Sequence, residues 1–165
     1  SWMTADGFAA AISAFTGQNL GAKKYKRIRD GYIQGMQILG GIGIFATLLL
    51  IFKAETLFAI FVPDDPAAIK EGITYLKILG LSQFFMTIEI GTTGAFNGLG
   101  KTLPPTLNSI ILNTLRIPAA IFLSKTALGL SGVWWSISLS SILKGVILFI
   151  LFEKYWRNSP WKNSI

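Results

Sequence analysis

Residues 31–52 read GYIQGMQILGGIGIFATLLLIF and contain no charged side chain. The hydrocarbon core of a bilayer is about 30 Å thick, and a helix rises about 1.5 Å per residue, so roughly 20 apolar residues can cross it. The strands of an outer-membrane barrel would be shorter and would alternate apolar with polar residues, whereas residues 42–52 are apolar on nearly every side. The stretch therefore predicts a membrane-spanning α-helix.

Four further segments qualify or nearly qualify as spans. They cover residues 2–18, 72–96, 104–124 and 133–152. Residues 54–62 are too short to span and are expected to form an interfacial helix before the acidic turn at Pro63-Asp64-Asp65-Pro66. We expect an all-α, polytopic transmembrane helical bundle with about five spans over residues 1–152, and a cytoplasmic tail over 153–165. The first segment begins at the end of the chain, so we expect a fragment of a longer protein.

The composition supports this class of protein and argues against others. Hydrophobic residues make up 52% of the chain and charged residues 14%, and the net charge is +7. Because the basic residues lie at the ends of apolar runs, we expect membrane lipids as partners and no nucleic acid. Histidine and cysteine are absent and the acidic residues do not cluster. We therefore expect no enzyme activity, no cofactor and no specific metal site.

The positions of the lysines and arginines predict an orientation, because basic residues in short loops are retained in the cytoplasm. One side of the bundle carries most of those outside the spans: Lys23, Lys24, Lys26, Arg27, Arg29, Lys101, Lys154, Arg157 and Lys162. The opposite side carries Lys53, Lys70 and Lys125. We expect a multi-pass protein of the cell inner (plasma) membrane with a cytoplasmic C-terminus.

Two acidic residues lie inside predicted spans. Glu89 would lie roughly 13 Å from the cytoplasmic boundary, where a bare carboxylate costs several kcal/mol and needs a partner, a proton or water. Arg116 in the next span has a similar depth, so the two could meet. They would form a structural ion pair, or Glu89 would exchange a proton or cation for substrate. Asp6 would be a second such site, or would lie near the outer interface in water.

Neutral polar residues in the third and fourth spans, Gln83 and Asn113 among them, can line a wet cavity or bond between helices. Lys77 and Lys144 are expected to extend their amino groups toward the two membrane interfaces. An acidic residue inside a membrane span is costly, and its presence there favours a functional role. The predicted ion-coupling or substrate cavity therefore comprises Glu89, Asp6, Arg116, Gln83 and Asn113.

Three motifs resemble those of one family, the multidrug and toxic compound extrusion (MATE) family. Residues 17–27, GQNLGAKKYKR, resemble its cytoplasmic loop motif. Residues 94–104, GAFNGLGKTLP, resemble its second-half motif, and Leu115-Arg-Ile-Pro118 follows in the next span. Met86 stands where some members carry aspartate, and Asn97 stands where many carry arginine.

The resemblance implies a transporter of two related six-helix lobes, in which this chain is the C-terminal lobe without its first helix. It implies export of small amphiphilic or cationic organic compounds in exchange for protons or sodium ions, with a sodium site near Glu89 as one arrangement. The N-terminal lobe of the same polypeptide would be a partner. Two alternatives stay open: a lipid-linked oligosaccharide flippase of the same superfamily, and a membrane scaffold that transports nothing.

Overall fold

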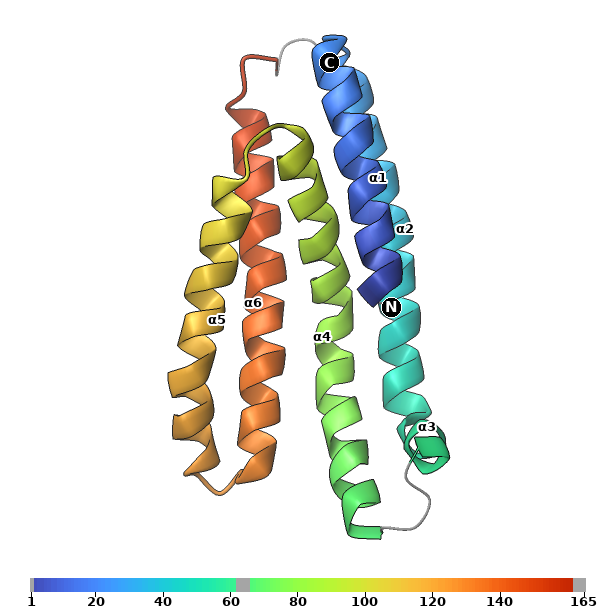
Figure 1. Cartoon of the computed structure of the whole chain (residues 1–165), viewed down its shortest axis with the longest axis vertical. Coiled ribbons are helices and arrows are strands. Elements are labelled where there is room, and N and C mark those ends of the chain that lie inside the picture. The colour runs from blue at the N-terminus through green and yellow to red at the C-terminus, as the bar shows by residue number, and fades with distance from the viewer. Residues whose placement is uncertain (1, 62–65, 162–165) are drawn as a thin grey trace.

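The computed structural model describes residues 2–61 and 66–161, and in this part of the chain it consists of helices joined by short turns (Figure 1). The helices are α1 (Trp2–Gly21), α2 (Tyr25–Phe52), α3 (Ala54–Phe61), α4 (Pro66–Gly98), α5 (Leu103–Ser124) and α6 (Leu130–Arg157). The described residues contain no strand. The all-α prediction is confirmed.

Four helices of the described part are long and apolar enough to cross a membrane: α2, α4 from Ile69 onward, α5 and α6. The short helix expected over residues 54–62 is α3, which has eight residues and cannot span. Its place at the membrane interface stays a prediction, and residues 62–65, with most of the expected acidic turn, lie outside the described residues. Helix α1 has 20 residues but falls short in apolar character, because it contains Asp6 and ends in the polar residues Gln18 and Asn19. Its role as a fifth span stays a prediction.

Two helices extend past the apolar stretches that predicted them. Helix α2 begins at Tyr25, before the uncharged stretch, and α6 continues to Arg157 through the first part of the expected tail. Lysine and arginine are good helix formers, and Lys154 and Arg157 in the last turn of α6 complement the negative end of its dipole. Residues 162–165 of the expected tail lie outside the described residues.

Helix α4 is the centre of the arrangement. Helices α1 and α2 form one antiparallel hairpin, α5 and α6 form another, and α4 runs between them (Figure 1). Helix α4 packs extensively against α1, α2 and α6, whereas α5 packs mainly on α6. Helix α5 is therefore held to the bundle chiefly through its hairpin partner.

Glycines let α4 approach its neighbours closely. A Cβ on Gly94 would overlap the backbone of Ala9 in α1, and a Cβ on Gly145 of α6 would overlap the backbone of Phe85 in α4. Close backbone approach at small residues stabilises membrane helix pairs through van der Waals contact. These two contacts fix how far α1 and α6 lie from α4.

An aromatic core lies at the end of the bundle that carries the α1–α2 turn. The ring of Phe152 lies 4.2 Å from that of Tyr32 and 5.2 Å from that of Phe96, measured between centroids. All three side chains are buried. Nearby, the guanidinium of Arg29 donates to both carboxylate oxygens of Glu153, at 2.7 and 2.9 Å. The start of α2 is thereby joined to the last turns of α6.

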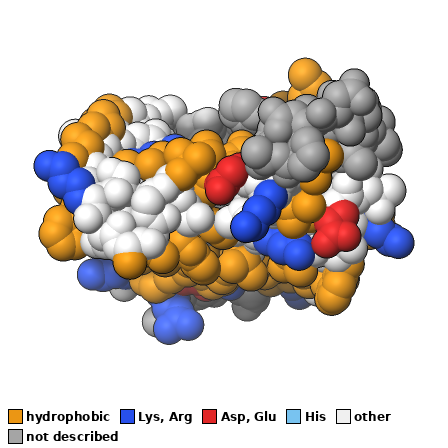
Figure 2. Space-filling model, turned by 90° about the horizontal axis from the view of Figure 1, so that it is seen from below, with side chains coloured by type: hydrophobic (Ala, Val, Ile, Leu, Met, Phe, Trp, Pro, Cys, Tyr) orange, Lys and Arg blue, Asp and Glu red, His pale blue; other side chains and the backbone are white. Residues whose placement is uncertain are grey.

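Figure 2 shows the opposite end of the molecule, where α3 and the α5–α6 turn lie. Acidic and basic side chains both appear there among hydrophobic ones, and several basic side chains project at the edges of the view. Along the flank of α5, Leu107, Ile110, Ile111 and Leu115 are each more than half exposed. An apolar flank of this extent is typical of a surface that contacts lipid or another apolar surface.

Candidate functional site

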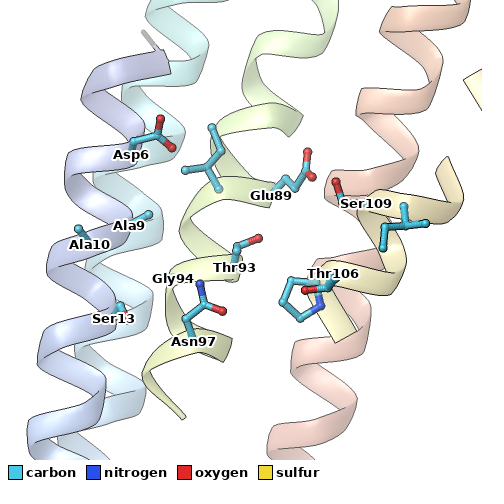
Figure 3. A pocket seen from close by; sticks show the side chains of 13 residues that line it. Asp6, Ala9, Ala10, Ser13, Glu89, Thr93, Gly94, Asn97, Thr106 and Ser109 are labelled. Atoms are coloured by element: carbon cyan, nitrogen blue, oxygen red, sulfur yellow. The ribbon is translucent and has the colours of Figure 1, made fainter. Parts of the chain in front are cut away.

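A groove lies between α1, α4 and α5 (Figure 3). Its volume is about 650 Å³, and ligand pockets in proteins measure roughly 300–1,000 Å³. The polar side chains that line it come from all three helices: Asp6, Ser13, Glu89, Thr93, Asn97, Thr106 and Ser109. The groove is large enough for a small organic molecule and offers it hydroxyl, amide and carboxylate groups.

Glu89, the acid singled out from the sequence, lines this groove and is nearly buried. Its Oε1 lies 3.3 Å from Nζ of Lys144 on α6, and the two side chains are 13% and 12% exposed. The expectation that Lys144 extends to the interface is wrong. The reason is the next residue, Gly145, which packs against the backbone of Phe85, one helical turn before Glu89.

Arg116 is held by serines of α6 and not by the carboxylate of Glu89. Its Nε donates to Ser140 Oγ at 2.7 Å, and its Nη2 contacts Ser141 Oγ at 3.4 Å. The hydroxyl of Ser136 donates to the backbone oxygen of Arg116 at 2.9 Å. Arg116 lies outside the groove lining, although it is near enough to Glu89 for the two charges to interact.

The other predicted site residues are divided between the groove and its surroundings. Asp6 lines the groove from α1 and is exposed (Figure 3). Asn113 donates to Ser109 Oγ at 3.2 Å, so it continues the polar stripe of α5 by one turn. Gln83 is half-buried on α4 and lies outside the groove lining. The structure therefore brings Asp6 and Glu89 to one groove, with Asn113 next to it.

Several residues that line the groove were not predicted as site residues, although their helical spacing indicates that they share a face with residues of the site. Ser13 follows Asp6 by seven positions, so both lie on one face of α1. Thr106, Ser109 and Asn113 are spaced by three and four positions on α5 and likewise share a face. A search for polar stripes within each span would have predicted the walls of the groove.

Carboxylates and hydroxyls together define the chemistry that the groove offers. Among the described residues, no group of three or more histidine, cysteine, aspartate or glutamate side chains is placed to hold a metal ion. The charged residues of the lining, Asp6 and Glu89, are both acidic. Oxygen ligands of this kind attract protons, hard monovalent cations and organic ammonium groups.

Relatives of known class match nearly the whole chain. Residues 2–122 match the MatE family model. The chain is 33% identical over 158 residues to the probable multidrug resistance protein NorM of Thermotoga maritima, covering 92% of this chain and 33% of that protein. Over 162 residues it is 22% identical to DNA damage-inducible protein F of Escherichia coli, covering 94% and 33% respectively. The chain spans about a third of the length of these curated relatives.

A solved structure has the same fold. It is the inward-facing conformation of a multidrug resistance MATE family transporter of the MOP superfamily. It superposes on this chain with a TM-score of 0.80 at 21% sequence identity, covering 88% of this chain and 34% of that one. The likeness shows a common fold and confirms the predicted membrane helical bundle. With the family match over residues 2–122, the chain belongs to the MATE family of membrane transporters.

Proposed function

We propose that the protein to which this chain belongs exports small amphiphilic or cationic organic compounds across the cell membrane in exchange for protons or sodium ions. The observation that carries the proposal is the groove between α1, α4 and α5, whose charged lining residues, Asp6 and Glu89, are both acidic. Two curated relatives are named probable multidrug resistance proteins, which supports export of this kind.

Glu89 is the residue through which the exchange would work. A carboxylate in an apolar span costs several kcal/mol unless a positive charge or a proton compensates it. A proton, a sodium ion and a cationic compound are alternative ways of supplying that compensation, and each excludes the others at a single carboxylate. Competition of this kind couples uptake of the ion to release of the compound.

The rest of the polypeptide would complete the cavity. This chain spans about a third of the length of its curated relatives, and the groove opens at its surface. We propose that the N-terminal lobe of the same protein covers the open side, and that the exposed apolar flanks elsewhere contact membrane lipids. The chain alone would then not transport.

A flippase for lipid-linked oligosaccharides fits the groove less well. Such a protein would need basic groups to hold a pyrophosphate. The described lining of the groove contains no lysine or arginine, and Lys144 and Arg116 lie outside it. The acidic lining favours a positively charged substrate.

Efflux of ethidium from cells that make the full-length protein tests the proposal under separately imposed proton and sodium gradients. We expect the wild type to export the dye with one of the two gradients, and Glu89→Gln to abolish this export because the charge is lost at equal size. Glu71→Gln is the matched control, since Glu71 is an exposed acid on the same helix. Full export by Glu89→Gln would refute the role of Glu89. Lack of any gradient-dependent export would favour the flippase.

A further inference from the structure

We propose that Lys144 is a tethered counter-cation, which neutralises Glu89 while the groove is empty and is displaced when a cationic compound enters. The inference rests on the proposed function, because it concerns how the same carboxylate receives its cation. It adds a residue that determines how tightly the groove holds a positive charge, and this residue is not itself part of the lining.

The ion pair is buried enough that each partner depends on the other. Nζ of Lys144 lies 3.3 Å from Oε1 of Glu89, and about seven-eighths of both side chains is shielded from solvent. Exposed ion pairs contribute little, whereas removing one partner of a buried pair leaves a charge whose isolation costs several kcal/mol. Glu89 therefore keeps Lys144 until another positive charge takes its place.

Glu89 can be reached from two directions. Nζ of Lys144 reaches the carboxylate from α6, and Glu89 also lines the groove between α1, α4 and α5 (Figure 3). Because Glu89 is part of the groove lining, a cation in the groove can contact the carboxylate with which Lys144 is paired. Because one positive charge suffices to neutralise one carboxylate, the entering cation and the ammonium compete for Glu89.

The ammonium can leave while its helix stays in place. The backbone oxygen of Lys144 accepts a hydrogen bond from Asn108 Nδ2 at 3.0 Å, and Gly145 packs on the backbone of Phe85. The four-carbon lysine side chain beyond this anchor is flexible and can extend along an apolar helix toward the interface. Arg116 is less suited to this part, because Ser140 and Ser141 already accept hydrogen bonds from its guanidinium.

Binding of tetraphenylphosphonium, a lipophilic monovalent cation, to the purified full-length protein in detergent tests the inference. We expect Lys144→Met to lower the Kd by roughly tenfold or more, because an ammonium that occupies Glu89 for about nine-tenths of the time or longer weakens the apparent affinity for a competing cation by at least that factor. Lys144→Arg restores a tethered cation and is expected to keep the wild-type Kd. Glu89→Gln is expected to weaken binding with or without the lysine.

Lys144→Gln is a second neutral variant, which keeps the test informative if Lys144→Met does not fold. It removes the charge but retains a hydrogen-bond donor for Glu89, so it too is expected to bind more tightly than the wild type. The melting temperature of each variant separates folding from binding. A pair with only a structural role would lower the melting temperature in both neutral variants and raise the affinity in neither.

The outcomes distinguish the two proposals. If the wild type binds the cation through Glu89 but neither neutral variant binds it more tightly, the counter-cation role is overturned and the proposed function stands. If the wild type shows no Glu89-dependent binding, both are overturned. Tighter binding by a neutral variant, reversed by Lys144→Arg, establishes the role.

Discussion

The contact between α1 and α4 sets the width of the groove. Gly94→Ala adds a single carbon atom, the Cβ, at this contact. The added Cβ would lie 2.9 Å from both the carbonyl carbon and the Cα of Ala9, and closer still to the carbonyl oxygen. Ordinary contacts begin at 3.4 Å. The obstacle is backbone and cannot rotate away, so α1 must move outward by about half an ångström or more.

The displacement has an estimable cost. A gap of about 0.5–1 Å forfeits a quarter to a half of the attraction between the atoms that separate. Gly98, one turn later, packs on Ser13 of α1 and would lose contact as well. Overpacking typically costs about 1–3 kcal/mol, and the better helix propensity of alanine returns up to about 1 kcal/mol. We expect a net loss of about 0–2 kcal/mol in the free energy of unfolding, and of about 1–3 kcal/mol relative to a glycine-to-alanine change without overlap.

Thermal unfolding of the purified full-length protein measures this loss as a lower Tm. Gly41→Ala is the matched control, because it makes the same change in α2 where a Cβ would meet nothing within 4 Å. We expect the control to keep or slightly raise the Tm. If Gly94→Ala is as stable as Gly41→Ala, α1 does not lie against α4 as described and the reasoning is refuted.

Three further predictions concern the ends and the orientation of the helices. Arg29→Met and Glu153→Gln should show a coupling of about 1 kcal/mol in a double-mutant cycle of unfolding, because the pair is bidentate but about one-fifth exposed; additive effects would contradict it. Gly145→Ala should lower the Tm by overlap with α4, and a Tm equal to that of the control above would show that α6 lies farther away. This chain has no cysteine, so single Lys101→Cys and Lys125→Cys variants, freed of cysteines elsewhere, report topology with an impermeant maleimide. Lys125→Cys should react in intact cells and Lys101→Cys only after permeabilisation, and the reverse pattern would invert the orientation.

The helices could be predicted because apolar length alone identifies a span. The uncharged stretch from Gly31 to Phe52 required no knowledge of neighbouring helices, since its apolar length alone is enough to cross a bilayer. The ends of α2 and α6 were harder to predict. Their charged residues lower the hydropathy and so suggest a loop, although lysine and arginine also favour helix. The motifs pointed to the family for a different reason, as they are particular residues at particular spacings.

The partner of Glu89 could not be predicted from the sequence. Position along a span gives depth in the membrane, and both Arg116 and Lys144 lie within spans next to that of Glu89. Which of them turns toward the carboxylate depends on the rotation of α5 and α6 about their axes. The contact of Gly145 with Phe85 and the serines around Arg116 set that rotation, and these contacts exist only once the helices have packed.

The polar contacts between α5 and α6 have a mechanical consequence. Asn108 is bonded to the backbone of Lys144, and Arg116 to the serines of α6, in a setting where little water competes for such bonds. A slide of α5 along α6 would leave an amide, a guanidinium and several hydroxyls without partners, so these bonds fix the register of the two helices. Helix α5 has few contacts with α4. The wall of the groove that α5 supplies is therefore placed by α6, a helix that contributes no residue to the described lining.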